Sequence, residues 1–246
     1  MQAERVALVT GSATGIGRAV ALKLAQQGYA IAVNYSRSHQ EAEDTLQQVE
    51  KLGVPGLLIR ANVARDDEVC RMVDQIVQTW KRIDVLVNNA GTTRFIDHRR
   101  LDLLTEEVWD EIFGVNLKGA FYCCRAVIPY MQQQGSGAIV NISSVAGILG
   151  IGSSIPYAAS KGALNTLTKS LARAFAPQIR VNAVAPGPVL TRWLADHMDH
   201  IERQMALTPM QRAATPEDIA DVVCFLVSGT HYITGQIIVV DGGRTM

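Results

Sequence analysis

The stretch that decides the fold reads Thr10-Gly11-Ser12-Ala13-Thr14-Gly15-Ile16-Gly17. It joins an apolar run at residues 6–10 to an amphipathic segment at residues 16–27, which is followed by Gly28. Glycines at a strand-to-helix junction allow a tight turn and close approach of the backbone to a pyrophosphate. The start of the helix adds free N–H groups and the positive end of its dipole. We therefore expect a dinucleotide to contact Gly11, Ser12, Thr14, Gly15, Ile16 and Gly17, although the spacing is Gly-x-x-x-Gly-x-Gly rather than Gly-x-Gly-x-x-Gly.

Short β-branched runs alternate with amphipathic segments along the rest of the chain. The pattern predicts strands at 6–10, 30–34, 56–60, 85–88, 138–142, 180–185 and 236–240. It predicts helices at 16–27, 40–52, 66–79, 105–134, 157–176 and 195–207, and another that opens at Thr215-Pro216-Glu217-Asp218. Near-continuous apolar strands joined by helices indicate a parallel sheet covered on both faces. The expected fold is α/β: one doubly wound Rossmann domain over residues 1–246, with a seven-stranded sheet.

Composition narrows the function before any motif is considered. The 246 residues carry 23 Lys plus Arg against 23 Asp plus Glu, so no basic excess points to nucleic acid or to an anionic membrane. No apolar stretch approaches the roughly eighteen residues of a membrane span, and the N-terminus lacks the apolar core of a signal peptide. The four cysteines follow no disulfide or metal spacing. We expect a cytoplasmic protein with reduced thiols.

Tyr157 and Lys161 lie one helical turn apart, and Ser144 lies thirteen residues upstream of the tyrosine. A tyrosine hydroxyl has an unperturbed pKa of about 10, so it is a poor acid near neutrality. A lysine ammonium four residues along the same helix face favours the phenolate, and we expect it to lower the pKa of Tyr157. Such a pair suits proton transfer in carbonyl–alcohol chemistry. Taken alone, the pair also fits an ordinary amphipathic helix with a solvated lysine.

The end of the second strand indicates which nucleotide binds. NAD-selective proteins usually place an acid about twenty residues past the glycines, where it holds the ribose 2′-hydroxyl. Here the stretch reads Asn34-Tyr35-Ser36-Arg37-Ser38, with no acid before Glu41. Arg37 can pair with a 2′-phosphate, and Ser36 or Ser38 can donate to it. The pattern favours NADP(H), and the alternative is an exposed loop arginine.

Together these motifs resemble the short-chain dehydrogenase/reductase family along essentially the whole chain. Further matching motifs are Asn88-Asn89-Ala90-Gly91, Asn116 within residues 115–119, Asn141-Ile142-Ser143-Ser144, Pro186-Gly187 and Asp241-Gly242-Gly243. The resemblance is to the branch that includes 3-oxoacyl-thioester reductases.

The resemblance implies a role for each matching residue. Tyr157 would exchange a proton with the substrate oxygen, and Lys161 would tune Tyr157 and hold the nicotinamide ribose. Ser144, with Ser143 as the alternative, would hold the substrate oxygen, and Asn116 would support a proton-returning water chain. Further cofactor contacts would come from Asn62, Val63, Asn88, Ala90, Gly91, Pro186, Gly187, Val189 and Thr191. The asparagines also fit a purely structural role at strand ends and turns.

Two departures from the family pattern bear on ligands. The third strand ends in Asn62-Val63, where the family usually has an acid near the adenine, so the charge is missing. Carrier-protein-dependent members carry basic residues after the long helix and after the catalytic helix, which suit an acidic carrier protein. This chain reads Met131-Gln132-Gln133-Gln134-Gly135-Ser136 and Ala176-Pro177-Gln178 at those sites. Docking of acyl carrier protein is therefore doubtful, whereas a coenzyme A thioester or a small ketone still fits.

The expected substrate region comprises residues 92–95, residues 150–152 and a lid at about 188–212. The lid is rich in thioethers and apolar side chains, which suit an apolar substrate or plain helix packing: Trp193, Leu194, Met198, Met205, Leu207 and Met210. Arg94 and Arg192 are candidates to hold a substrate carboxylate. His197 and His200 lack the further ligands that a zinc site needs, so we expect no metal.

Apolar residues on more than one face of two helices suggest subunit contacts, and the resemblance implies a homotetramer. These are Phe121, Tyr122, Ala126 and Ile128, and Ala163, Leu164, Leu167 and Leu171. The predicted activity is NADP(H)-dependent hydride transfer between nicotinamide and a ketone or secondary alcohol, with a 3-oxoacyl thioester or similar small-to-medium ketone as substrate. Alternatives are a sugar, polyol or cyclic-alcohol dehydrogenase, a non-catalytic NADP-binding regulator, and a scaffold subunit.

Overall fold

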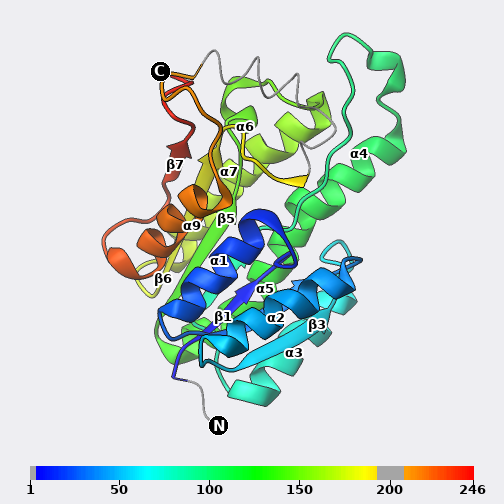
Figure 1. Cartoon of the computed structure of the whole chain (residues 1–246). Coiled ribbons are helices and arrows are strands. Elements are labelled where there is room, and N and C mark those ends of the chain that lie inside the picture. Colours follow the sequence, from blue (N-terminus) through cyan, green and yellow to red (C-terminus); the bar gives the residue numbers. More distant parts are fainter. Residues whose placement is uncertain (1–3, 193–207) are drawn as a thin grey trace.

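A computed structural model describes residues 4–192 and 208–246, and one parallel sheet runs through them (Figure 1). Its strands lie in the order β3-β2-β1-β4-β5-β6-β7, with every neighbouring pair parallel. Their bounds are β1 (Val6–Val9), β2 (Ala30–Tyr35), β3 (Gly56–Arg60), β4 (Val85–Asn88), β5 (Gly137–Ile142), β6 (Ile179–Pro186) and β7 (Ile237–Val240). The expected seven-stranded, doubly wound sheet is confirmed.

Helices cover both faces of this sheet. One face carries α1 (Gly15–Gln26), α2 (His39–Lys51) and α9 (Pro216–Cys224), and the other carries α3 (Asp66–Trp80), α5 (Ala120–Gln134) and α7 (Ile155–Phe175). The remaining described helices are α4 (Glu106–Phe113), the four-residue α6 (Ala146–Leu149), the 3-10 turn η1 (Leu101–Leu103) and the π-helices η2 (Gly114–Gly119) and η4 (Phe225–Gly229).

Alternation along the strands explains why both faces are covered. Ala7 and Val9 of β1 pack into the core beneath α1 and α9, whereas Val6 and Leu8 pack into the core beneath α3 and α5. All four side chains are fully buried. Burying a large aliphatic side chain contributes about 1.5–3 kcal/mol, so a strand that is apolar on both sides is stable only between two helix layers.

The helix expected at residues 105–134 is interrupted in its middle. The π-helix η2 separates α4 from α5 and contains Asn116, whose side chain is almost fully buried. Gly119 of η2 packs closely against Val63, which follows β3. A Cβ added at Gly119 would stand only 2.8 Å from Val63 Cγ2. A π-turn shifts the helix face by inserting backbone, and apolar periodicity does not reveal such a shift.

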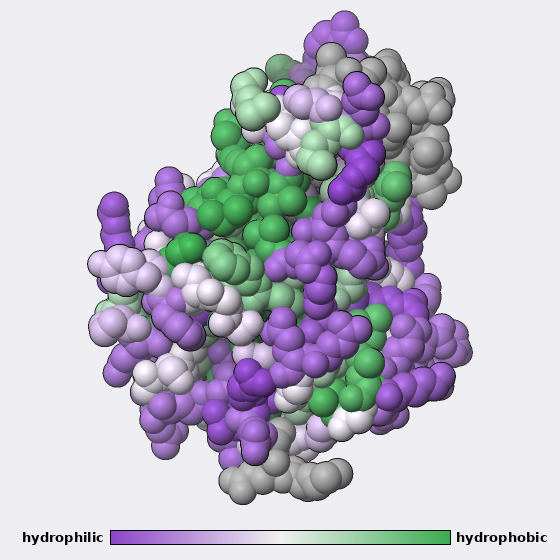
Figure 2. Space-filling model, turned by 60° about the vertical axis from the view of Figure 1, so that its left-hand side comes forward, coloured by the Kyte–Doolittle hydropathy of each residue, from purple (hydrophilic) through white to green (hydrophobic). Residues whose placement is uncertain are grey.

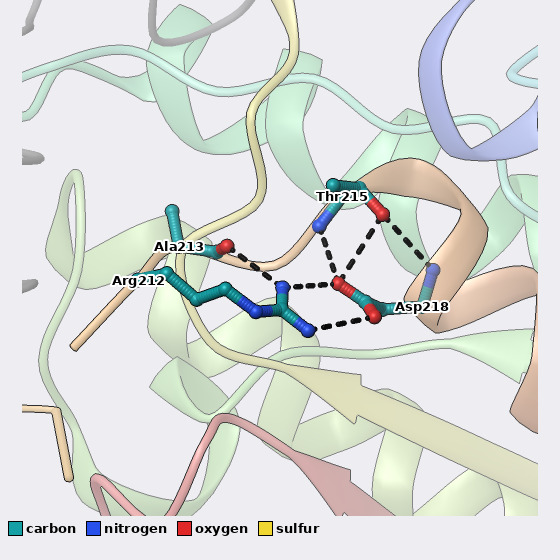
Figure 3. Close-up of polar contacts among 4 residues, drawn as sticks. All are labelled: Arg212, Ala213, Thr215 and Asp218. Carbon is teal, nitrogen blue, oxygen red and sulfur yellow. Dashed lines mark hydrogen bonds and ion pairs between the residues drawn. The ribbon is translucent and has the colours of Figure 1, made fainter. Parts of the chain in front are cut away.

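Polar caps set the starts of two helices near the site. Ser154 Oγ accepts a hydrogen bond from Tyr157 N at 3.4 Å, so α7 begins at Ile155, two residues before the expected position. At α9 the expected cap is confirmed. Thr215 Oγ1 accepts from Asp218 N, and the Asp218 carboxylate accepts from Thr215 N at 2.7 Å (Figure 3).

The segment after β6 is fixed to this helix start. Arg212 pairs with both oxygens of the Asp218 carboxylate, and its guanidinium holds the pKa of that carboxyl far below the usual range (Figure 3). An isolated parallel bridge joins Val189 to Ala214. Most of the expected lid and the helix expected at 195–207 lie outside the described residues.

Apolar side chains also reach the surface at one edge of the sheet. Figure 2 looks toward the side of the molecule where β7 lies in Figure 1, and a broad apolar area occupies its centre. β7 is an edge strand in which Val239 is 40% exposed, and Phe225, the first residue of η4, is 52% exposed. None of the described helices is long and apolar enough to span a membrane.

Candidate active site

A cavity of about 1130 Å³ runs along the carboxyl ends of β1, β2, β4, β5 and β6. This edge is where open parallel sheets bind ligands, because the strand order reverses between β1 and β4. Most of the residues expected at the site line it: Gly11, Thr14, Gly15, Ile16, Ser36, Arg37, Asn62, Val63, Ala90, Gly91, Ser144, Tyr157, Lys161, Pro186, Gly187, Val189 and Thr191. Ser12, Gly17, Asn88 and Asn116 do not line it.

The glycine turn has a backbone that side chains would obstruct. Gly11 and Gly15 have φ values of +62° and +57°, which favour glycine. A Cβ at Gly17 would stand 2.5 Å from Gly11 O and 2.4 Å from Asn89 Nδ2, an atom that itself donates to Thr10 O and Gly11 O. Gly17 therefore leaves no room for a side chain in the turn, and its expected contact with a ligand stays a prediction.

The start of α1 leaves its N–H groups available to a ligand. Thr14, the residue before the helix, makes no side-chain cap, and the first turn holds no acidic residue. Such a start attracts an anion. The cradle at the glycine turn and the size of the cavity together fit a dinucleotide with its pyrophosphate at this helix.

Ser12 braces the turn from inside. Its hydroxyl is fully buried, donates to Val9 O at 2.8 Å and accepts from Asn34 N at 3.1 Å. Asn34 in turn accepts from Gly11 N through Oδ1 at 3.1 Å. The Ser12 side chain therefore holds β1 to β2, and the expected contact of Ser12 with a cofactor stays a prediction.

Helix α3 brings to the end of β3 a carboxylate that the sequence motif lacks. Asn62 Oδ1 accepts from Ala64 N at 3.1 Å, and Asn62 N donates to Glu68 Oε2 at 2.8 Å. Glu68 belongs to α3 and lines the cavity. The charge expected to be missing here is thus present on the next helix, where no motif signals it.

Asn88 turns away from the cavity. Its Nδ2 donates to Asn141 Oδ1 at 2.9 Å and lies 3.3 Å from Cys124 Sγ, inside the layer between β4, β5 and α5. Its Oδ1 is buried without a partner among the described residues. Asn88 is therefore not among the residues that line the cavity, whereas its neighbour Asn89 is, and the expected cofactor contact of Asn88 stays a prediction.

Ser144, Tyr157 and Lys161 meet at the other end of the cavity. Ser144 follows β5, the other two lie on α7, and the Ser144 and Tyr157 side chains are hydrogen-bonded. Lys161 Nζ donates to Ile142 O at 2.7 Å and lies 5.7 Å from the centroid of the Tyr157 ring. A Cβ at Gly147 of α6 would stand 2.5 Å from the Lys161 carbonyl carbon, so close helix packing holds α7 in place.

Burial shifts both titratable groups toward their neutral forms. It raises the pKa of Tyr157 above its usual value, and the Ser144 hydrogen bond offsets only part of that rise. It lowers the pKa of Lys161 to about 8. The expectation of a lowered Tyr157 pKa is wrong for this arrangement, because loss of solvation is the largest effect on the Tyr157 hydroxyl and only the Ser144 hydrogen bond opposes it.

The two neighbouring serines have different surroundings. Ser143 Oγ is bonded to Asn165 Oδ1 at 2.6 Å and to Lys161 O at 3.3 Å, so it faces α7. Ser144 Oγ accepts from Ala146 N at 3.1 Å and meets Tyr157. The geometry therefore favours Ser144 over Ser143 as the partner of a substrate oxygen.

Asn116 ties the π-helix to both sides of the site. Its Oδ1 accepts from Thr92 N at 2.8 Å, and its Nδ2 donates to Thr92 O and to Ser160 Oγ, both at 3.0 Å. Its side chain is thus fully engaged in joining the loop after β4 to α7. Its neighbour Val115 lines the cavity.

Two loops border the cavity beside Tyr157. Thr93 Oγ1 and Ser153 Oγ lie 2.5 Å apart, and Ile96 N donates to Ser153 O at 2.8 Å. A Cβ at Gly152 would stand 3.6 Å from Tyr157 Cδ1. These are the loops expected around the substrate, and the structure joins them to each other.

Both arginines expected to hold a substrate carboxylate form ion pairs, and Arg192 lies near the start of α2. Arg94 pairs with Glu111 at 2.8 Å, and Arg192 pairs with Glu41 at 3.1 Å near the start of α2. Residues 4–192 and 208–246 contain no cluster of ligands suited to a metal ion, and His197 and His200 lie outside them. The four cysteines are free thiols, of which Cys70 is exposed.

The fold and the cavity define a class: a dinucleotide-binding α/β protein with a serine, a tyrosine and a lysine at one end of its ligand cavity. A family model described as enoyl-(acyl carrier protein) reductase matches residues 11–245. Ketoacyl reductase 2, assigned to the granaticin polyketide synthase of Streptomyces violaceoruber, is 44% identical over 97% of this chain and 95% of its own. The 3-oxoacyl-(acyl-carrier-protein) reductase FabG of Staphylococcus aureus is 43% identical over the full length of both chains.

A solved structure gives the same result. A Burkholderia xenovorans chain assigned to the short-chain dehydrogenases/reductases superposes with a TM-score of 0.94 at 38% identity, over 100% of this chain and 99% of its own. The protein belongs to the short-chain dehydrogenase/reductase family, whose members use a nicotinamide cofactor. It is an oxidoreductase that acts on C=O and CH–OH groups.

Proposed function

We propose that this protein reduces a 3-oxoacyl thioester, or a similar small-to-medium ketone, with NADPH. The observation that carries the proposal is the meeting of Ser144, Tyr157 and Lys161 at one end of a cavity whose other end is a glycine turn. A bound nicotinamide supplies the hydride for the carbonyl carbon. The residues of the chain then have to hold the carbonyl oxygen and deliver a proton to it.

Tyr157 is the proposed proton donor. Its neutral hydroxyl, favoured by burial, gives its proton to the substrate oxygen as negative charge develops there. Ser144 Oγ, which is hydrogen-bonded to Tyr157, donates to the same oxygen and holds it in place. Lys161 stabilises the phenolate that remains, since its ammonium lies over the Tyr157 ring.

Return of the proton to Tyr157 passes through Lys161 in this proposal. A pKa of about 8 allows Lys161 to release and regain a proton near neutral pH. Asn116 acts as a positioning residue, because it joins the loop at Thr92 to Ser160 on α7, next to Lys161. In the oxidative direction the same groups work in reverse.

The proposed preference for NADP(H) rests on the end of β2. Arg37 is exposed, lines the cavity and has no part in the ion pairs found among the described residues, so its guanidinium can meet a 2′-phosphate. Ser36 and Ser38 line the cavity beside it.

The walls beside Tyr157 favour an apolar substrate. Phe95 and Ile151 line the cavity and are 44% and 37% exposed. Two relatives are named as reductases of ketoacyl groups, which supports a 3-oxoacyl thioester. Residues 131–136 and 176–178 carry no basic side chain to pair with an acidic carrier protein, so we favour a coenzyme A thioester or a free ketone.

The exposed apolar area around β7 supports the proposed homotetramer, because monomers rarely leave such an area in water (Figure 2). The cytoplasmic location remains a prediction from the sequence. The boundaries of the domain and of the lid remain predictions as well.

The test is nicotinamide oxidation by the purified protein, followed by absorbance with NADPH and with NADH. The substrates are acetoacetyl-coenzyme A, free ketones and a panel of sugars and polyols assayed in the oxidative direction. We expect turnover of the thioester with NADPH. Turnover of sugars or polyols alone would replace the proposed substrate class. Absence of all turnover would favour the non-catalytic regulator or the scaffold subunit.

A further inference from the structure

Arg192 lies at the nucleotide end of the cavity rather than beside Tyr157. It follows β6 by six residues, and its guanidinium reaches the start of α2. Nη2 donates to Ser38 Oγ at 2.8 Å, and Nη1 lies 3.1 Å from Glu41 Oε1. Arg192, Arg37 and Ser38 all line the cavity. The chain thus brings a second guanidinium to the end of β2 from a segment more than 150 residues away.

Packing against the glycine turn explains this position. A Cβ at Gly15 would stand 3.3 Å from Thr191 Cγ2, so Thr191 rests on the turn and Arg192 continues beyond it toward α2. The turn itself, Gly11–Gly17 in the printed sequence, offers no cationic side chain. Positive charge for a phosphate on the adenosine ribose therefore has to come from other segments.

The ion pair between Arg192 and Glu41 bears on which nucleotide the protein prefers. Glu41 lies in the first turn of α2, one helical turn past the cap at Ser38. Glu41 does not itself line the cavity, but an unpaired carboxylate one turn from Ser38, which does line it, would repel a 2′-phosphate bound there. In this structure the Glu41 carboxylate is paired with Arg192 rather than with Arg37.

We propose that Arg192 is a specificity-determining residue: together with Arg37 it holds the 2′-phosphate, and it neutralises Glu41, which would otherwise favour NADH. This inference rests on the proposed preference for NADP(H). A 2′-phosphate carries a charge near −2 and offers several acceptor oxygens, so two guanidinium groups and Ser38 match it better than one arginine alone.

The test measures dissociation constants for NADPH and NADH from nicotinamide fluorescence, without any turnover. The proteins are wild type, Arg192→Ala, Arg192→Lys, Glu41→Gln and the Arg192→Ala/Glu41→Gln double variant. Arg71→Ala is the matched control, because Arg71 forms an exposed ion pair with Asp67 on α3 and does not line the cavity. Thermal unfolding of each variant checks that it is folded.

We expect Arg192→Ala to weaken NADPH at least about tenfold, because a charge-assisted contact is lost, while NADH binds within about twofold of wild type or more tightly. Arg192→Lys should retain part of the preference. Removing Glu41 in the Arg192→Ala background should recover part of the lost NADPH affinity. Glu41→Gln alone and Arg71→Ala should keep the wild-type ratio of the two constants.

Two results overturn the inference. If Arg192→Ala weakens both nucleotides equally, or neither, while wild type still prefers NADPH, then Arg37 alone selects the nucleotide and the proposed cofactor stands. If removing Glu41 recovers no affinity, the neutralising role is wrong. A wild-type protein that binds NADH as tightly as NADPH would instead remove the proposed cofactor and this inference with it.

Discussion

The two ends of the cavity are built by different means. At the nucleotide end, backbone geometry dominates: Gly11 and Gly15 adopt positive φ, and Gly17 leaves no room for a Cβ. At the reacting end, side chains dominate: Lys161 is buried, Tyr157 is half-buried, and loss of solvation disfavours the charged form of each. The comparison teaches that the nucleotide end is specified by glycines, which lack a side chain. The reacting end is specified by polar functional groups that lose solvation when they are held in the protein.

The two ends should therefore fail in different ways. A substitution that disturbs the backbone at the nucleotide end should weaken the binding of both nucleotides and should also lower the stability of the fold. Damage to a side chain at the reacting end should remove turnover while binding survives. The predictions that follow test this separation.

The largest expected effect is that of Tyr157→Phe. Loss of the proton donor should lower kcat about 10³-fold, because a positioned acid contributes about 10²–10⁴-fold. The dissociation constant for NADPH should stay within about threefold of wild type. Steady-state kinetics and fluorescence titration measure the two quantities. Tyr130→Phe on α5, a half-buried tyrosine that does not line the cavity, is the control and should change neither.

The next largest effect is expected from Gly17→Ala. Its Cβ would stand 2.5 Å from Gly11 O, so the turn has to shift, and both nucleotides should bind at least about 30-fold more weakly. The thermal midpoint should fall as well. Gly114→Ala is the matched change, since the nearest atom to its Cβ is 3.7 Å away, and it should leave binding intact. Normal NADPH binding by Gly17→Ala would refute the role given to the backbone.

A smaller effect should appear as a pH dependence of stability due to Lys161. Its pKa is about 8 in the folded protein and near 10.5 when unfolded, so the unfolded chain binds more protons between these pH values. Stability of the wild type relative to Lys161→Met should therefore rise with pH, by about 2 kcal/mol between pH 7.5 and 10. Urea unfolding at one fixed protein concentration measures the difference. A difference that is flat or falls with pH would contradict the burial of the ammonium.

The smallest effect is expected from Arg37→Ala. NADPH should bind about tenfold more weakly, which corresponds to the loss of a charge-assisted contact at an exposed site. NADH serves as the internal control and should change less than about twofold. Equal weakening of the two nucleotides would show that Arg37 supports the loop rather than the 2′-phosphate.

Much of this arrangement could be predicted from local sequence. The seven strands follow from apolar runs bounded by turns, and the glycine turn follows from its place between β1 and α1. The pairing of Tyr157 with Lys161 on one helix face follows from their spacing. These features depend on residues that are close together in the chain, so the periodicity of apolar residues, two in strands and 3.6 in helices, can indicate them.

The features that could not be predicted depend on distant contacts. Glu68 reaches the cavity from α3, and Arg192 reaches α2 from beyond β6. The π-helix around Asn116 depends on Thr92 and Ser160. The direction in which the pKa of Tyr157 shifts depends on loss of solvation, which the spacing of Tyr157 and Lys161 does not reveal.

The most direct test of whether the two ends of the cavity act independently combines a substitution at each end in one set of proteins. NADPH and NADH dissociation constants and kcat are measured for wild type, Arg37→Ala, Tyr157→Phe and the double variant. Arg37→Ala should lower the ratio of the NADH to the NADPH dissociation constant by the same factor in wild type and in Tyr157→Phe. Tyr157→Phe should lower kcat at saturating NADPH by the same factor in wild type and in Arg37→Ala. Both expectations follow because distant sites without shared partners act additively. A change in nucleotide preference caused by Tyr157→Phe would contradict the account.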